Sequence, residues 1–490
     1  MELREQMQLA LDALRAGKVT ESVSQLQEVI ARAPAVAAAW ANLGNAERER
    51  GQIDAALQAY DQALRFAEGG PDADWIWSNY LMTQCYREAE PGRPCWQIHE
   101  QWGQRLAPAQ EPTWRHRWDA DRRLHVGWVS GDFRWHSVAF FLLALLRNLD
   151  REQFEVTCFS NHPDTDEMTE ILRSQVDAWV DIHEASDERV LQQIRRSRVD
   201  VLVDLSGHSA YHRMAVFAKR AAPVQLSWLG YPGPTGNPEI DFWMTDAIIC
   251  PPSESCPWKG SRPLRLNAGC HAYHPPLSES EMPPVAVRTE HPGPTLGCFN
   301  HRAKLSRETV EMWAEVLNAA PTARLLLKSR CYQDAQACDE IRQQFQALGV
   351  AAERLELWAR TPSTREHLEG YQQMDIALDT YPYAGTTTTF ESLWMGVPVV
   401  TRCGVEPASR VGASILRQLG RSEWVASDRR GFVQAALRLI EDAAQRKDFR
   451  TTAREAMRLS GLTDGARFAR SWQAAVRGVW QEQVRKRTES

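Results

Sequence analysis

The sequence predicts an α/β protein of two Rossmann-like lobes preceded by an all-α domain of helical repeats. The first hundred residues contain helical patterns that recur with a spacing of 34 residues. From residue 124, and again from residue 295, short apolar runs alternate with amphipathic helical runs. A proline-rich span at 275–294 separates these stretches and is typical of a linker. A chain of 490 residues is also too long for a single hydrophobic core.

The repeats are recognised by residues of related size that lie 34 positions apart. The matched pairs are Gly17 with Gly51, Val19 with Ile53, Ser22 with Ala56, and Leu26 with Tyr60. Small residues are expected where paired helices cross closely, and large ones between successive repeats. A helix–turn–helix period of this length is typical of tetratricopeptide (TPR) repeats. We expect a TPR-like domain over 1–105, in which "WIWSNYLMTQCY" and the stretch 96–102 continue the helical stack.

The first α/β stretch begins with "HVGWVSGDF", a short strand pattern that ends in a loop. It continues with "VAFFLLALLRNL" (helix), "FEVTCFSN" (strand), "DERVLQQIRRS" (helix), "VDVLVDLSG" (strand) and "PVQLSWLGYPG" (strand). Alternation of strands with helices indicates βαβ units and a parallel, doubly wound sheet. We assign 106–284 to this N-terminal lobe, which we expect to be the acceptor side.

The second α/β stretch also alternates strand and helix patterns, and we assign it to a C-terminal lobe over 285–455. Its segments are "TLGCFN", "ETVEMWAEVLNAA", "ARLLLKS", "CDEIRQQFQALG", "LELWAR", "HLEGYQQM", "IALDTYP", "TTFESLWMG" and "PVVTRCG". A final helix within 456–490 is expected to pack back on the lobes. Two Rossmann-like lobes with a cleft between them form the GT-B architecture, in which ligands lie outside the carboxyl ends of the strands.

The stretch "YAGTTTTFESLWMG" joins a buried strand to a helix and offers a candidate anion site. Free N–H groups and the dipole at a helix start attract phosphate without a metal. The hydroxyls of Thr386, Thr387 and Thr388 add donors, and Gly385 lets the backbone approach a diphosphate. Glu391, about one turn further, is placed to accept both hydroxyls of a ribose. The alternative is ordinary N-capping, but one hydroxyl suffices for that, so we predict nucleotide binding.

Asn300 and Lys304 lie where the first strand of the second lobe passes into its first helix, in "GCFNHRAKLSRETV". A lysine at this point is able to neutralise a leaving diphosphate as a point charge. The alternative for an isolated lysine is a solvated surface position.

The first lobe has polar residues at two strand ends. Asp132 and His136 follow the first strand, where the histidine is a candidate base or a hydrogen-bonding residue on the acceptor side. Asp204 and His208 follow a later strand and have the same candidate role. A helix-capping or structural histidine is the alternative in both places. The loop "LGYPGPTG", which contains Gly233, either wraps a phosphate or makes a tight turn.

The composition excludes several classes of protein. A net charge of −6 argues against nucleic-acid binding, which requires a basic face. No stretch approaches the roughly 18 apolar residues of a membrane helix, and the N-terminus has no signal-peptide pattern. The ten cysteines form no CxxC pair, and Cys250, Cys256 and Cys270 lack zinc-site spacing. We expect a cytoplasmic protein with reduced thiols. We expect no metal site, because the Asp-Thr-Asp triplet at 164–166 is a pattern that arises by chance in polar loops.

Six segments, taken in order, resemble the O-GlcNAc transferase/SPINDLY family of protein glycosyltransferases. They are "VGWVSGDFRWHSVAFF", "LVDLSGH", "APVQLSWLGYPGPTG", "FNHRAKLS", "LDTYPYAGTTTTFESLWMGVPVVT" and "ASRVGASIL". The resemblance runs from the repeats to about residue 480, and the "GHS" and "YAGTTTT" segments are closer to the SPINDLY branch.

The resemblance implies an inverting, metal-independent enzyme without a permanently bound cofactor. Such an enzyme moves a sugar from a nucleotide sugar to a serine or threonine hydroxyl of a protein. Lys304 and the helix start at 386–388 would hold the diphosphate, and Glu391 would bind the ribose. His367 would lie beside the nucleobase and His136 at the reacting end. The repeats would present the acceptor polypeptide.

The sequence departs from the O-GlcNAc branch, which has a histidine at Thr386, an aspartate at Glu391 and a glutamine at His301. A histidine once proposed as the base in that branch falls near Arg195 here. UDP-GlcNAc and GDP-fucose therefore both remain candidate donors. The alternatives are a small-molecule sugar transferase or epimerase, which needs no repeat groove, and an inactive scaffold, which needs no diphosphate site.

Overall fold

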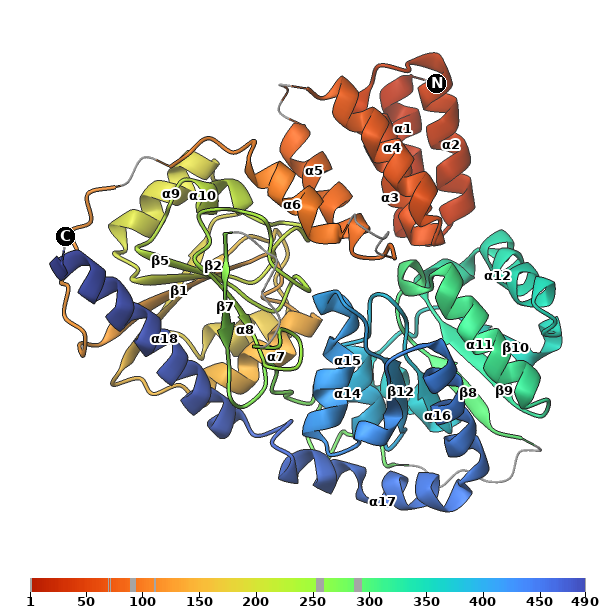
Figure 1. Cartoon of the computed structure of the whole chain (residues 1–490). Helices are drawn as coiled ribbons and strands as arrows, with labels where there is room; N and C mark the ends of the chain where they lie inside the picture. Colours follow the sequence, from red (N-terminus) through yellow and green to blue (C-terminus); the bar gives the residue numbers. More distant parts are fainter. Residues whose placement is uncertain are drawn as a thin grey trace. The chain divides into compact units, whose positions relative to one another are not determined.

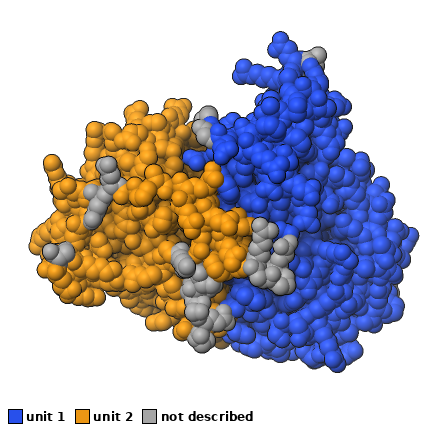
Figure 2. Space-filling view, turned by 45° about the horizontal axis from the view of Figure 1, so that its top comes forward, with its two compact units in different colours: residues 1–90, 276–457 blue, residues 91–275, 458–490 orange. Residues whose placement is uncertain are grey.

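The computed structural model describes residues 2–68, 70, 72–88, 94–109, 112–252, 260–285 and 293–489 (Figure 1). These residues form two compact units, each assembled from two stretches of the chain (Figure 2). Unit 1 comprises 1–90 and 276–457, and unit 2 comprises 91–275 and 458–490. Cys256 and the central part of the proline-rich span, 286–292, lie outside the described residues. The domain boundaries given above stay predictions.

Unit 1 begins with two pairs of antiparallel helices that repeat with the predicted period. The helices are α1 (Leu3–Arg15), α2 (Val19–Arg32), α3 (Ala37–Arg50) and α4 (Ile53–Phe66). A fifth helix, α5 (Ala73–Gln84), packs on α4. The first residues of α1 and α3, and those of α2 and α4, are 34 positions apart, so the helical repeats are confirmed.

Residues at matched positions have the same structural role in the two repeats. Gly17 and Gly51 both adopt left-handed backbone angles, with φ of 80° and 85°, and each begins the turn between paired helices. Tyr60 is fully buried, and a Cβ atom on Gly44 would lie 2.7 Å from its ring. The missing side chain at Gly44 therefore lets α3 and α4 cross closely.

The rest of unit 1 is built on a six-stranded, all-parallel sheet with the order β10-β9-β8-β11-β12-β13. Its strands are β8 (Thr295–Cys298), β9 (Arg324–Lys328), β10 (Leu355–Trp358), β11 (Ile376–Leu378), β12 (Val399–Arg402) and β13 (Val425–Ala426). Its helices are α11 (Arg307–Ala319), α12 (Ala335–Ala347), α13 (Thr364–Gly370), α14 (Thr387–Trp394), α15 (Val411–Gln418), α16 (Arg429–Glu441) and α17 (Ala443–Leu459). The strand order reverses between β8 and β11, as in a Rossmann fold.

Unit 2 contains a seven-stranded parallel sheet with the order β3-β2-β1-β4-β5-β6-β7. Its strands are β1 (Leu124–Ser130), β2 (Phe154–Ser160), β3 (Ala178–Asp181), β4 (Val201–Asp204), β5 (Val224–Ser227), β6 (Phe242–Thr245) and β7 (Arg262–Arg265). Its helices are α6 (Cys95–Gly103), α7 (Ser137–Leu146), α8 (Glu167–Arg173), α9 (Asp187–Arg196), α10 (Met214–Ala218) and α18 (Gly465–Glu489). The order reverses between β1 and β4. The two doubly wound sheets and the repeats confirm the predicted fold class.

The long helix α18 closes the core of unit 2, packing against α7 and β5. Its Trp472 is fully buried and stacks on Trp128 of β1, with ring centroids 5.3 Å apart. Phe468 stacks in the same way on Trp228, at 5.6 Å. The last described helix of the chain is therefore part of the core around the first strand.

No helix among the residues that the structure describes has the length and apolar character needed to cross a membrane.

Candidate functional site

The predicted nucleotide residues lie at the switch point of the sheet in unit 1. Asn300 and Lys304 follow β8, and the threonine run follows β11, the neighbouring strand across which the strand order reverses. Both strands point their carboxyl ends to the same edge because the sheet is parallel. Ligands of doubly wound sheets bind at this edge.

The start of α14 is not capped by a threonine side chain. Thr386 is the N-cap residue, and it makes no side-chain capping hydrogen bond. The N–H of Phe390 donates to the Thr386 carbonyl at 3.1 Å. The N–H groups of Thr387, Thr388 and Thr389 precede this bond and therefore have no partner within the helix. The ordinary capping alternative is thus wrong for Thr386, and the helix end presents free donors.

The four hydroxyls of the run divide into two kinds. Thr389 is buried and its hydroxyl donates back to the Gly385 carbonyl at 3.0 Å. The Thr388 hydroxyl donates to Oδ1 of Asn300. Thr386 and Thr387 are half-buried beside the free N–H groups. Thr388 and Thr389 therefore fix the turn, and Thr386 and Thr387 lie at the start of the helix.

Asp379, at the end of β11, organises the loop that carries these groups. Its Oδ1 accepts hydrogen bonds from the N–H of Gly385 at 2.7 Å and from the side-chain amide of Asn300 at 3.2 Å. Its Oδ2 accepts from the Thr401 hydroxyl at 2.7 Å. Burial raises the pKa of Asp379, while the hydrogen bonds and the Lys304 charge act in the opposite direction.

Lys304 brings its ammonium group to the same loop. Nζ donates to the Ala384 carbonyl at 3.0 Å and lies 3.9 Å from the centre of the Tyr383 ring. Burial lowers the pKa of Lys304 to about 8, although the nearby charge of Asp379 favours the protonated form. The group is therefore a cation at neutral pH that loses its charge in mildly alkaline solution.

Glu391, one turn inside α14, lies beside His367 of α13. His367 Nε2 and the Tyr371 hydroxyl each lie 2.9 Å from Oε2 of Glu391. The Lys328 ammonium contacts Nδ1 of His367. An ammonium group only donates, so Nδ1 accepts and the imidazole proton is on Nε2, facing the carboxylate. Phe299 flanks this group, with its ring 4.7 Å from that of Tyr371.

In unit 2, His136 and Asp132 follow β1, at the switch point of the seven-stranded sheet. His136 is the N-cap of α7: its Nδ1 accepts from the Val138 N–H at 3.3 Å and lies 3.5 Å from Oδ1 of Asp132. Because Nδ1 is an acceptor here, the neutral ring carries its proton on Nε2. Burial lowers the pKa of His136. The ring is suited to donate a hydrogen bond from Nε2 rather than to accept a proton there.

His208 and Asp204 lie below the surface of the same edge. His208 is 1% exposed, and its Nε2 lies 2.8 Å from the Thr235 carbonyl, to which it donates. Trp102 of α6 packs edge-on against it, with ring centroids 4.7 Å apart. Burial lowers the pKa of His208 well below its usual range and raises that of Asp204 to about 7. The environment of His208 is that of a structural histidine.

The other candidate residues of unit 2 lie in structural positions. Gly233 is buried in the loop after β5, one strand beyond the switch point. In the acidic triplet, Asp166 is the N-cap of α8: its Oδ1 accepts from the Thr169 N–H at 3.0 Å and its Oδ2 from the Trp135 N–H at 2.7 Å. The carboxylate of Asp166 is thus committed to a capping box.

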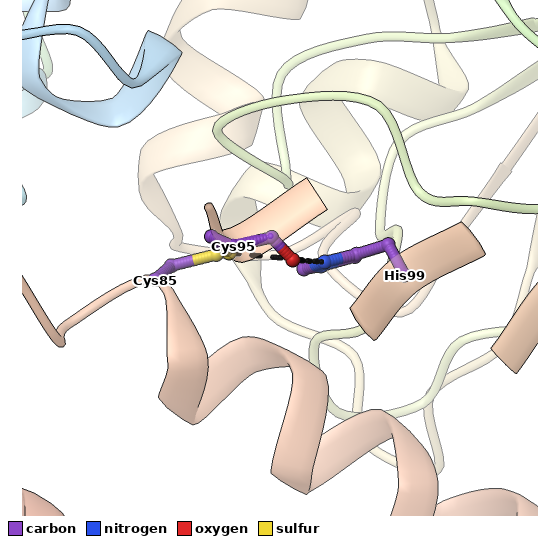
Figure 3. A group of neighbouring side chains, drawn as sticks. All are labelled: Cys85, Cys95 and His99. Atoms are coloured by element: carbon purple, nitrogen blue, oxygen red, sulfur yellow. Dashed lines mark hydrogen bonds between the residues drawn. The ribbon is translucent and has the colours of Figure 1, made fainter. Parts of the chain in front are cut away.

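Cys95 and His99 lie one turn apart on α6 (Figure 3). Nδ1 of His99 lies 2.9 Å from the Cys95 carbonyl and donates to it, so Nε2 accepts from the Tyr231 hydroxyl. One ring nitrogen is therefore bonded within α6, and the other supports Tyr231 in the loop after β5.

The sequence analysis missed Asp379, Lys328, Tyr371 and Tyr383. Asp379 and Lys328 each sit at the carboxyl end of a predicted strand, in "IALDTYP" and "ARLLLKS". The strand-end rule that selected Asp132 and Asp204 would have found both, had it been applied throughout. The two tyrosines have no such local signal, since their roles depend on contacts with distant residues.

Two family profiles match the chain. Glycosyl transferase family 41 matches 107–259 and 295–471, and the tetratricopeptide repeat matches 7–71. A protein of Solanum lycopersicum named probable UDP-N-acetylglucosamine–peptide N-acetylglucosaminyltransferase SPINDLY is 34% identical over 84% of this chain and 44% of its own length. The protein of the same name from Oryza sativa is 34% identical over 86% of this chain and 46% of its own length. The chain thus spans less than half the length of these plant relatives.

A solved structure agrees with these matches. It is a lysine-to-methionine mutant of the Thermobaculum terrenum O-GlcNAc transferase, 32% identical, with a TM-score of 0.93 over 99% of this chain and 92% of that one. The matches bear out the resemblance found in the sequence.

Proposed function

Because the chain belongs to glycosyl transferase family 41, we propose that it transfers a sugar from a nucleotide sugar to serine or threonine hydroxyls of acceptor proteins. The plant relatives, which are named as probable peptide N-acetylglucosaminyltransferases, support a protein acceptor. The tetratricopeptide repeats support the same acceptor class, because stacked repeats form extended surfaces for binding polypeptides.

The observation that carries the proposal is the uncapped start of α14 beside the Lys304 ammonium. Free N–H groups, the hydroxyls of Thr386 and Thr387, and one lysine together match the needs of a diphosphate. Preorganised donors at a leaving group are usually the largest single catalytic contribution. In this proposal they take the place of a divalent cation at the leaving diphosphate.

The nucleoside end of the donor is assigned to the group around Glu391. The carboxylate is held from one side by His367 and Tyr371, which orients it to accept from ribose hydroxyls. The Phe299 ring and the His367 ring provide flat surfaces for a nucleobase.

At the reacting end, the acceptor oxygen attacks the anomeric carbon while the bond from that carbon to the diphosphate breaks, which inverts the configuration. His136 is assigned as a hydrogen-bond donor through Nε2, because Nδ1 is held by the helix start. The hydroxyl proton then passes to the donor phosphate or to water. Asp132 Oδ1 lies 3.5 Å from the same Nδ1, and its charge favours the protonated form of the ring. His208 is given no direct role because it is buried.

The test is calorimetric titration of the purified protein with UDP and with GDP, in the presence of EDTA. Preference for UDP would support UDP-GlcNAc as the donor, and preference for GDP would support GDP-fucose. Binding of neither nucleotide would overturn the proposal and favour an inactive scaffold. Binding that appears only after Mg²⁺ is restored would overturn the metal-independent form of the proposal.

A further inference from the structure

We propose that Tyr86, which follows the last helix of the repeat region in unit 1, is a positioning residue of the donor site. Its ring holds Tyr383 against the ammonium group of Lys304. This inference rests on the proposed role of Lys304 as a diphosphate ligand. It makes the repeat region a part of the donor site as well as a surface for acceptors.

The geometry links the three side chains in one line of contacts. Tyr86 is 8% exposed and stacks on Tyr383, with ring centroids 5.1 Å apart and planes 26° from parallel. The Tyr383 ring in turn lies under Lys304 Nζ at 3.9 Å. The next residue, Ala384, accepts a hydrogen bond from the same Nζ at 3.0 Å. The loop 383–384 therefore fixes the ammonium group, and Tyr86 supports the loop from behind.

The repeats also hold the backbone that carries Lys304. Lys304 ends the 3₁₀ turn η1 (Arg302–Lys304), which packs against α3. Glu49 of α3 accepts from His301 at 3.1 Å and from Arg330 at 2.9 Å. The turn that carries Lys304 is thus held by Glu49 of α3, and its ammonium group is supported through Tyr383 by Tyr86, which follows α5.

The environment of Lys304 provides a readout that a purely structural role would not change. Asp379 and Cys298 are the ionisable groups whose charges act on the ammonium, and Tyr383 lies against it with Tyr86 behind. Burial lowers the pKa of Lys304 to about 8. Removing the Tyr86 ring admits water toward the ammonium and raises that pKa toward the ordinary lysine value.

The experiment measures the affinity of Tyr86→Leu for UDP and for GDP at pH 7 and pH 9. At pH 7 we expect binding about three- to tenfold weaker than in the wild type, the range for loss of one aromatic contact. At pH 9 the difference should shrink or reverse, because Lys304 keeps its proton longer in the variant. Tyr86→Phe keeps the ring and should bind like the wild type.

The matched control is Tyr80→Leu, which removes another tyrosine of the same region, on α5. It should leave both affinities and their pH dependence unchanged. Equal affinities of Tyr86→Leu and wild type at both pH values would overturn the inference. So would a loss that is the same at both pH values and is shared by Tyr80→Leu. If Tyr86→Leu does not fold, Tyr383→Leu tests the same contact from the other side, with the same expected pH dependence.

A wild-type protein that binds neither nucleotide would instead overturn the proposed function itself. The two failures are therefore distinguishable in one set of titrations.

Discussion

At the scale of single residues, the assignment of Lys304, beside the start of α14, depends on a buried charge. The Lys304 ammonium lies between the Ala384 carbonyl and the Tyr383 ring, and burial lowers its pKa to about 8 although the Asp379 charge favours the protonated form. Burying a charged group costs free energy that a solvated lysine would not lose. We therefore expect this buried ammonium group to act on a ligand.

Lys304→Ala should lower the rate of transfer severely while leaving the fold intact. Loss of one preorganised contact to a developing anion lowers kcat by about 10²–10³-fold. The measurement is sugar transfer to a protein acceptor, with circular dichroism and thermal unfolding as checks. Lys219→Ala, an exposed lysine of unit 2, is the control and should retain its activity. A Lys304→Ala enzyme with most of its rate would contradict the assignment.

Nucleotide affinity should fall as the pH rises through about 8, because Lys304 then loses the proton that gives it its charge. Lys328 has a pKa lowered to about 8 by burial as well, and it faces His367. The two lysines are separated by titrating Lys304→Met and Lys328→Met from pH 6.5 to 9.5. The pH dependence should be nearly lost in Lys304→Met and retained in Lys328→Met, and the reverse pattern would assign it to Lys328.

The sequence predicted which residues lie along the carboxyl edges of the sheets. It did not predict how deeply each of these residues is buried. Thr386, Thr387, Asn300 and Lys304 were placed at a strand-to-helix junction, a relation that local patterns reveal. His208 satisfied the same rule, yet it is buried under Trp102 of a helix more than a hundred positions earlier in the chain. Burial by a distant element leaves no local signal.

At the scale of elements, helix starts account for two features that were ambiguous in the sequence. At the start of α14, the side chain of the N-cap residue makes no capping hydrogen bond. At the start of α8, Asp166 and Thr169 cap the helix through a reciprocal pair of hydrogen bonds. One helix end is therefore satisfied by the protein, and the other presents donors.

Asp166→Ala should lower the free energy of unfolding by about 1 kcal/mol, the usual effect of losing an N-cap. It should leave nucleotide binding in EDTA unchanged. Urea unfolding and the UDP and GDP titrations check these expectations. A variant with wild-type stability but with a lost, Mg²⁺-dependent activity would instead assign the acidic triplet to a metal.

Gly44→Ala should lower the free energy of unfolding by about 1–3 kcal/mol, because its Cβ would lie 2.7 Å from the Tyr60 ring. Gly478→Ala, on α18, is the matched control: no atom lies within 4 Å of its Cβ position. A helical glycine in open space should gain up to about 1 kcal/mol on this change. Equal effects of the two substitutions, measured by urea unfolding, would contradict the close crossing of α3 and α4.

Three of the strands that the sequence missed lie at sheet edges and are polar, exposed or very short, whereas the fourth, β6, is fully buried. The strand β7 has the sequence "RPLR" and lies at the edge, where a proline is tolerated. The strand β3 is half-exposed, and β13 has two residues. None of these three edge strands has the buried apolar run that revealed β1, β4 and β11. The strands β1, β4 and β11 were predictable because burial on both faces leaves an apolar run without polar alternation.

At the scale of the whole molecule, the sequence predicted that the final helix packs back on the lobes, but not which segments share a core. The sequence indicated three consecutive domains and a final helix, and local patterns contain no information on which distant segments share a core. In the structure, α18 shares the core of unit 2 with β1. The repeats share unit 1 with the six-stranded sheet, through contacts such as the ion pair of Arg50 with Glu340.

Trp472→Ala should lower the free energy of unfolding by about 3–5 kcal/mol, because it removes a fully buried ring from the core of unit 2. Arg470→Ala, two positions away on the exposed face of α18, should change it by less than about 0.5 kcal/mol. Denaturant unfolding followed by tryptophan fluorescence measures both. A small effect at Trp472 would mean that α18 is not needed for the core around β1.

The interleaving of the two units also bears on biosynthesis. A chain emerges from the ribosome in order, and domains usually fold as they emerge. Here β1 is synthesised hundreds of residues before Trp472 and Phe468, the side chains that cover Trp128 and Trp228. The sheet of unit 2 therefore exposes apolar surface until the second stretch of unit 1, and then α18, have been translated. Apolar surface that stays exposed during such a delay is prone to aggregation, which is the hazard that chaperones counter.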